Sequence, residues 1–113
     1  MPLPGDHEIQ IELLDLLSTA PDGQMRPRDT YRVLAQRFPR LTRDETTIPY
    51  RNSVSHWANR VQFARLHLVQ LGYILPPHSG GGRGIWTIST KGRKALSDRK
   101  ALADKLLAEL ERL

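Results

Sequence analysis

The sequence predicts a mainly α-helical domain with one small β-hairpin, and three observations support this fold class. Through most of the chain, apolar residues recur at spacings of three and four positions, which is typical of amphipathic helices. In the last third, two short segments rich in β-branched and aromatic residues flank a glycine-rich stretch at 76–84. The length of 113 residues, with 39% hydrophobic and 26% charged residues, fits one globular domain.

Two helices are expected in the N-terminal part. The first begins at Asp6, a residue type that favours the N-cap, and ends at the turn formed by residues 20–23. Its apolar positions are Ile9, Leu13, Leu14, Leu16 and Leu17. The second helix is expected from about Arg28 to Phe38, because Pro39 and the polar residues after it break the apolar pattern.

A third and longer helix is expected to start near Asn52 or Ser53. It should end before Gly72, which stands where a left-handed C-terminal cap belongs. Its apolar positions are Trp57, Val61, Ala64, Leu68 and Leu71. Their spacing of 4, 3, 4 and 3 predicts a core-facing seam, so we interpret Trp57 as a core residue rather than an exposed stacking platform.

After the third helix, Tyr73–Leu75 and Ile85–Ile88 are expected to pair as a hairpin with a basic tip at Arg83. A last helix is expected from about Thr90, with Ser89 or Thr90 at its cap, to Leu113. This order predicts a winged helix-turn-helix fold, in which helix three enters the major groove and the hairpin loop, the wing, contacts the backbone.

The expected domain division is a winged-helix DNA-binding domain at residues 1–96 and the C-terminal part of the last helix at residues 97–113. In the last helix, Ala103, Leu106, Leu110 and Leu113 repeat the helical spacing. That pattern fits either packing against helix one or dimerisation, and the sequence leaves both open.

The charge of the chain is concentrated in one part of the sequence. Residues 46–97 contain seven Lys or Arg residues and no Asp or Glu, whereas the first fifty residues sum to −2. The net charge of +5 therefore predicts a positive face, as expected for a polyanion partner. A solvated basic surface with no partner is the alternative interpretation.

Several other classes of protein and site are not expected. The chain has no cysteine, so it has no disulfide or cysteine zinc site, and its four histidines lack metal-ligand spacing. We expect no cofactor, because the Gly80–Gly84 stretch lacks the order of a phosphate-binding loop. No signal peptide or membrane-spanning apolar run is present, which favours a cytoplasmic location.

Motifs along the chain resemble the N-terminal winged-helix domain of the Mrr family of restriction endonucleases. The similar segments are Pro2–Pro4 with Ile9, Leu13 and Leu14, then Trp57–Arg65, Leu68, Leu71–Ile74, Arg83–Ser89 and Gly92–Arg93. The resemblance extends to about Leu96. In that family the domain is joined to a C-terminal nuclease domain that cuts modified DNA. This chain ends at Leu113, where the nuclease domain would begin, so the resemblance implies DNA targeting without enzymatic cleavage.

The expected DNA-binding residues lie on helix three, on the wing and at the start of the last helix. They are Arg51, Ser53, His56, Asn59, Arg60, Arg83 and Lys91. Asn59 has the groups to pair with an adenine, and Arg51 or Arg60 with a guanine. Arg83 is expected to contact the minor groove or a phosphate and Lys91 a phosphate, and the alternative for both is a solvated surface residue. As alternatives, Asn59 and Arg60 are structural residues that bond to the preceding loop or to helix one, and His56 is a solvated surface residue.

We therefore predict a non-catalytic DNA-binding module of the Mrr type. Its expected partner is double-stranded DNA, including duplexes with modified bases, and a separate nuclease chain or a homodimer is left open. The alternative function is a protein-interaction or dimerisation module without direct DNA binding. In that case Phe63 and Leu66, which lie off the predicted core seam, would dock the partner. Alternatively, these two residues form a second core flank against the last helix.

Overall fold

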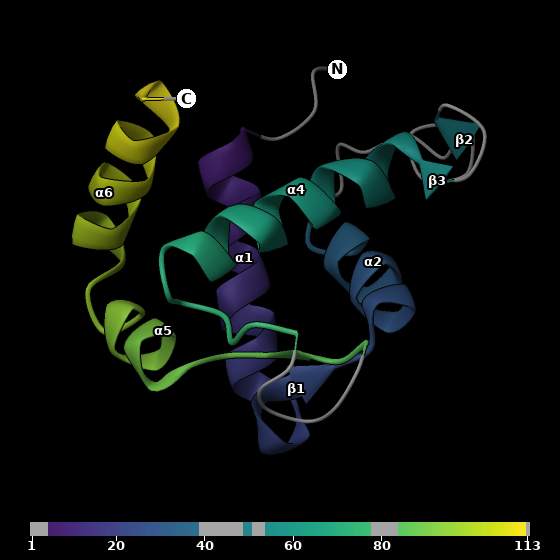
Figure 1. Cartoon of the computed structure of the whole chain (residues 1–113), viewed down its shortest axis with the longest axis horizontal. Coiled ribbons are helices and arrows are strands. Elements are labelled where there is room, and N and C mark those ends of the chain that lie inside the picture. The colour runs from purple at the N-terminus through teal and green to yellow at the C-terminus, as the bar shows by residue number, and fades with distance from the viewer. Residues whose placement is uncertain (1–4, 39–48, 51–53, 78–83, 113) are drawn as a thin grey trace.

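The computed structural model describes residues 5–38, 49–50, 54–77 and 84–112. They form a small, mainly helical globule (Figure 1). Its helices are α1 (Asp6–Thr19), η1 (Pro21–Gly23, a 3₁₀ turn), α2 (Pro27–Ala35), α4 (His56–Gln70), α5 (Thr90–Ala95) and α6 (Arg99–Glu111). Its strands are β1 (Gln24–Met25), β2 (Pro49–Tyr50), β3 (Val54–Ser55) and β4 (Trp86–Thr87). Helix α4 crosses α1, with α2 on one side of α1 and α6 on the other.

The core lies between α1 and α4, as the apolar spacing predicts. Four of the five predicted seam positions are buried in α4, and the fifth, Leu71, follows the end of α4 and is half-buried. The buried four are Trp57, Val61, Ala64 and Leu68. Trp57 is 1% exposed, and its Nε1 donates a hydrogen bond to the backbone oxygen of Tyr31 in α2 at 2.9 Å. The interpretation of Trp57 as a core residue is therefore confirmed, and the indole also fixes α2 against α4.

Two antiparallel strand pairs accompany the helices. In the first, β1 pairs with β4, so that Gln24 stands opposite Thr87 and Met25 opposite Trp86. This partner of β4 was not predicted from the sequence. The expected hairpin between Tyr73–Leu75 and Ile85–Ile88 is present only as one bridge, between Ile74 and Ile88.

Two backbone hydrogen bonds form that bridge, one on each side of the Ile74–Ile88 pair. Leu75 N–H donates to the oxygen of Thr87 at 2.9 Å, and Ser89 N–H donates to the oxygen of Tyr73 at 3.0 Å. Ile88 N–H in turn donates to the oxygen of Gly23 at 2.9 Å. The segment around β4 consequently lies between the chain near Gly23 and the chain near Ile74.

Two helix starts differ from the sequence prediction. Gly5, not Asp6, is the N-cap of α1, and Asp6 is the first helical residue. The Glu8 carboxylate accepts the Gly5 N–H at 3.1 Å, the contact that the third helical residue makes in a capping box. Helix α4 starts at His56 rather than near Asn52 or Ser53, because Val54 and Ser55 are extended and pair with β2.

Two helix ends also differ. Helix α2 ends at Ala35, and the next three residues continue with i→i−3 hydrogen bonds up to Phe38, a tightened last turn. The predicted single last helix is two helices, because the Asp98 carboxylate accepts the N–H of Ala101 at 3.1 Å and starts α6. Ser89 caps α5 as expected, accepting the N–H of Gly92 at 3.0 Å.

Helix α6 packs against α1, as one of the two interpretations of its apolar spacing predicts. Leu102 and Leu106 are buried in this contact, while Leu110 is half-buried. The turn before the strand segment is also as predicted, because Gly72 adopts a φ of +87° at the end of α4. The C-terminal helices thus form one side of the globule and leave the outer face of α4 uncovered by any described element.

Candidate nucleic-acid interface

The outer face of α4 is not covered by any element that the structure describes. Opposite the buried seam, helical spacing places Asn59, Gln62, Phe63, Leu66 and Gln70 on this face. Phe63 is 64% exposed and Leu66 is 46% exposed, whereas Asn59 and Gln62 are half-buried. Helix α4 contains no acidic residue, so no carboxylate of its own opposes a negatively charged partner.

The predicted DNA-binding residues have different positions relative to this face. Arg51, Ser53 and Arg83 lie outside the described residues. His56 is the first residue of α4, and Asn59 follows one turn later. Gln62 is not among the predicted DNA-binding residues, although its position three residues after Asn59 places it on the same face. Its Nε2 donates to the Tyr31 hydroxyl at 2.8 Å, which fixes the amide at the edge of that face.

Arg60 is turned toward α1 rather than toward the centre of the outer face. Its guanidinium forms an ion pair with Asp6 at 2.6 Å, and its side chain is only 19% exposed. The predicted structural alternative, a bond from Arg60 to helix one, is therefore present in the molecule. Asp6 is 60% exposed, so this ion pair lies at the surface and water competes with it.

The side chain of Lys91, a residue of α5, reaches the C-terminal end of α4. Its Nζ donates to the oxygen of Leu71 at 2.9 Å and lies 5.2 Å from the ring centroid of Tyr73. A cation is unfavourable in the first turn of its own helix, α5, but here it is stabilised by the negative end of the α4 dipole. The sequence could not indicate this compensation, because it depends on how α4 and α5 meet.

The carboxylates of α1 are largely neutralised inside the fold. Arg37 pairs with Glu12 at 3.0 Å and with Asp15 at 2.6 Å, and Arg99 also pairs with Asp15. Burial alone would raise the pKa of Asp15, but the hydrogen bonds from Arg37 and Arg99 outweigh it and hold that pKa below 3.8. The pKa of Arg37 is raised, because its bonds to Asp15 and Glu12 outweigh its partial burial.

Other basic side chains remain without an acidic partner. Within residues 5–38, 54–77 and 84–112, the ion pairs do not include Arg26, Arg28, Arg65, Arg93 or Lys94. Arg26 and Arg28 are exposed at the start of α2, and neither is among the DNA-binding residues predicted from the sequence. Arg65 lies over the Trp86 ring, 5.6 Å from its centroid. Lys100 and Lys105 of α6 are also absent from these ion pairs, so among the described residues the unpaired positive charge lies on α2, α4, α5 and α6.

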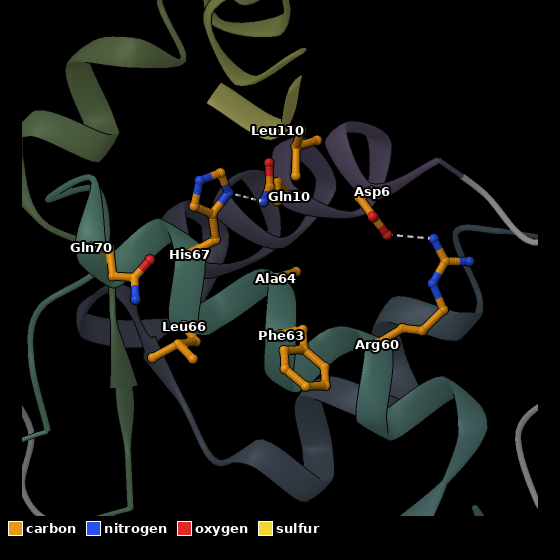
Figure 2. A pocket seen from close by; sticks show the side chains of 9 residues that line it. All are labelled: Asp6, Gln10, Arg60, Phe63, Ala64, Leu66, His67, Gln70 and Leu110. Atoms are coloured by element: carbon orange, nitrogen blue, oxygen red, sulfur yellow. Dashed lines mark hydrogen bonds and ion pairs between the residues drawn. The ribbon is translucent and has the colours of Figure 1, made fainter. Parts of the chain in front are cut away.

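Two hollows flank the outer face of α4, and Phe63 and Leu66 form the ridge between them. The first, about 510 Å³, is shown in Figure 2. Its lining residues are Asp6, Gln10, Arg60, Phe63, Ala64, Leu66, His67, Gln70 and Leu110. The second, about 420 Å³, lies toward α2 and Trp86. A partner on this face would therefore meet a raised apolar ridge with a depression on each side.

Two further properties of the described part of the chain bear on its function. Among those residues, no three His, Cys, Asp or Glu side chains are grouped as a metal site requires. None of the helices in that part has the length and apolar character needed to cross a membrane.

Comparison with known families identifies the domain. The model of the Mrr N-terminal domain matches residues 7–98, from α1 through α5 and into the turn before α6. No curated protein and no solved structure matches the chain. Because the family match covers well over half of the sequence, the chain belongs to the Mrr N-terminal domain family.

Proposed function

We propose that this chain is a non-catalytic DNA-binding module that acts through a winged helix-turn-helix. The observation that carries the proposal is the contrast in charge between α1 and α4. The α1 carboxylates Asp6, Glu12 and Asp15 are held by arginines, while α4 has no acidic residue and an uncovered outer face. Such a separation favours a polyanion at α4.

The arrangement of elements supports the architectural part of the proposal. Helix α2 is tied to α4 by the Trp57–Tyr31 hydrogen bond, and β4 lies beside both β1 and the chain near Ile74. A helix pair followed by a small sheet is the arrangement in which α4 serves as the recognition helix. The loop between Ile74 and β4 would then be the wing, with Arg83 near its tip.

In this mechanism Asn59 faces the bases and Gln62 stands beside it. Both amides have the donor and acceptor pair that reads adenine in the major groove. Arg51, Ser53 and His56 are proposed to act at the same end of α4, with Arg51 or Arg60 as the guanine reader. Arg83 and Lys91 would contact phosphates, and Arg28 is added here as a phosphate contact because it is exposed and has no ion pair among the described residues.

Membership of the Mrr family supports a role in a restriction system. We propose that the module targets double-stranded DNA, with modified bases as candidate determinants, and that a separate nuclease chain performs cleavage. Under this proposal the purified chain binds duplexes but does not nick them with any divalent metal. Metal-dependent nicking that follows the folded domain through several preparations would refute the non-catalytic part.

A second function is favoured by one specific observation. Phe63 and Leu66 are 64% and 46% exposed on the face proposed for DNA, and exposed apolar clusters mark protein contacts. In this alternative the ridge docks a protein partner or a second copy of the chain, and the basic charge is incidental.

A fluorescence-anisotropy titration at several salt concentrations separates these functions. We expect duplex binding whose affinity falls with salt at a log–log slope of about −4 to −5, the value for roughly four to six phosphate contacts. Modified and unmodified duplexes of the same sequence should be compared in parallel. No detectable binding to any duplex at about 50 mM salt, where phosphate contacts are strongest, would refute DNA binding and favour the protein-interaction alternative.

A further inference from the structure

The outer face of α4 carries a stripe of side chains with a regular chemical order. Asn59, Phe63, Leu66 and Gln70 follow one another at spacings of 4, 3 and 4 residues, so they lie along one side of the helix. In Figure 2 Phe63 and Leu66 project from the same side of α4, away from Gln10 of α1. Along this stripe, two large apolar side chains are therefore flanked by an amide at each end.

The described fold does not account for this apolar ridge of Phe63 and Leu66. In the described part of the chain, the large apolar side chains that remain exposed are Phe63, Leu66 and Leu107. The first two are neighbours on one helix face, whereas Leu107 lies on α6. A polar group buried against the ridge would lose its hydrogen bonds to water without gaining others. A partner of this face is therefore expected to present an apolar group at the ridge.

The surroundings of the ridge favour DNA over a protein as that partner. Helix α4 has no acidic residue, and Pro27 lines the second hollow together with Phe63 and Leu66. On either side of Pro27, Arg26 and Arg28 are exposed and absent from the ion pairs of the described residues. A specific protein interface buries about 800 Å² on each partner, far more than two side chains supply. Positive charge beside a narrow ridge therefore fits a duplex better than an apolar protein surface.

The major groove offers one apolar group to such a ridge. In unmodified DNA it is the C5-methyl group of thymine, since the other base edges present hydrogen-bond donors and acceptors there. Phe63 and Leu66 are three residues apart, about 4.5 Å along the helix axis, which is close to the ~3.4 Å rise between stacked base pairs. We infer that Phe63 and Leu66 contact the C5-methyl groups of thymines at two neighbouring base pairs, an inference that rests on the proposed function because that function places a duplex on this face.

The amides at the two ends of the stripe fit the same kind of base pair. Asn and Gln side chains pair with the N6 and N7 atoms of adenine, and every thymine stands opposite an adenine. Asn59 precedes Phe63 by four residues and Gln70 follows Leu66 by four, so each amide lies about 6 Å along the axis from an apolar side chain. The preferred duplex is therefore expected to contain a run of A·T pairs centred on the ridge.

Removal of single methyl groups from DNA tests the inference. The probe is the tightest-binding duplex recovered from a randomised pool, and deoxyuridine replaces one of its thymines at a time, which deletes only the methyl group. Fluorescence anisotropy should show about four-fold weaker binding at each of two neighbouring positions, the loss expected for one buried methyl-sized group. Deoxyuridine at thymines elsewhere in the duplex controls for changes in DNA shape and should leave the affinity unchanged.

Variants of the protein assign each methyl group to a side chain. Phe63→Ser should abolish the effect of deoxyuridine at one of the two positions, and Leu66→Ser should abolish it at the other. Phe63→Leu keeps an apolar side chain and should retain the thymine preference that Phe63→Ser loses. Leu107→Ser is the matched control, because Leu107 is 41% exposed on α6, and it should leave both effects unchanged. All of these substitutions replace exposed side chains, so the variants are expected to fold.

Three outcomes would overturn this inference and leave the proposed DNA binding intact. The first is a randomised pool that binds but yields no site with neighbouring A·T pairs. The second is salt-dependent binding that is insensitive to deoxyuridine at every position. The third is an unchanged effect of deoxyuridine in both Phe63→Ser and Leu66→Ser, which would assign the methyl contacts to other residues and leave the ridge to a protein partner. Absence of binding to any duplex would instead refute the proposed function and this inference together.

Discussion

The two faces of α4 differ in how far the fold accounts for their residues. On the inner face, Trp57 is 1% exposed and Leu68 is 0% exposed. On the outer face, Phe63 and Leu66 are exposed, yet both are large and apolar. Burial accounts for every inner residue, whereas nothing in the described fold requires an apolar residue outside. Folding alone therefore does not explain the exposed apolar residues of the outer face, and we look to function for the explanation.

The largest effect that this contrast predicts is on stability. Trp57→Ala removes a buried indole and its hydrogen bond to Tyr31, so it should lower the free energy of unfolding by about 3–5 kcal/mol. Phe63→Ala removes an aromatic ring too, but an exposed one, and should change stability by no more than about 0.5 kcal/mol. Urea denaturation of both variants measures the difference. Comparable losses would mean that the outer face is also part of the folded core.

The inner face of α4 could be predicted because burial leaves a periodic pattern in the sequence. The 4-3-4 spacing of Trp57, Val61, Ala64 and Leu68 is sufficient to place the seam. Strand β1 could not be predicted in the same way. Gln24 and Met25 are too few to show an alternating pattern, and their partner strand β4 lies more than sixty residues away in the chain.

The ends of the helices were predicted less well, for local reasons that compete. Asn52 and Ser53 are good cap residues, but pairing of Val54 and Ser55 with β2 delays the start of α4 to His56. Asp98 interrupts an apolar pattern that is otherwise continuous. Its side chain caps α6, so a break occurs where periodicity alone indicates one helix.

The candidate site could be predicted only in outline. The absence of acidic residues in α4 is visible in the sequence, and so is the position of Asn59. The role of Arg60 is not, because its partner Asp6 is 54 residues away and is brought near only by the packing of α1 on α4. The hollow at Gln10 and His67 depends on the same packing, between residues 57 positions apart.

The next largest effect concerns DNA affinity on the outer face. If Asn59 or Arg51 reads a base, its replacement by alanine should cost about 1–3 kcal/mol of binding free energy on the preferred duplex. It should also reduce the difference in affinity between that duplex and other sequences. Arg83→Ala, which removes a proposed contact to the DNA backbone, should lower the affinity for all duplexes alike. It should also make the salt slope shallower by about one. Anisotropy titrations on two duplexes measure both quantities.

Each of these variants must first unfold at the wild-type temperature, because loss of the fold would also abolish binding. An altered sequence preference in Arg83→Ala, with none in Asn59→Ala or Arg51→Ala, would reverse the roles. The wing would then read the sequence and α4 would only position it.

A smaller effect is expected at Asp15 of α1, which pairs with Arg37 and Arg99. The pKa of Asp15 is lower in the folded chain than in the unfolded chain, so its ionised form stabilises the fold. This contribution is present above pH 3.8 and is lost as the pH falls through the lower pKa of the folded chain. Thermal unfolding between pH 7 and pH 2 should show this loss in the wild type. The Asp15→Asn variant should be less stable than the wild type at pH 7, and its unfolding temperature should fall less as the pH is lowered. An unchanged loss of stability in acid would contradict the role given to Asp15.

The smallest effect tests Arg60, a predicted DNA-binding residue whose side chain is directed toward α1. Asp6 is 60% exposed, so Asp6→Asn should cost less than about 1 kcal/mol of stability while releasing Arg60 from its ion pair. If the freed guanidinium contacts DNA, affinity should rise by a few-fold, and Arg60→Ala should remove that gain. Asp104→Asn is the control, because it deletes the same charge at an exposed position on α6. Equal gains from Asp6→Asn and Asp104→Asn would show that Arg60 contributes only to the general field and that its specific role is to join α4 to α1.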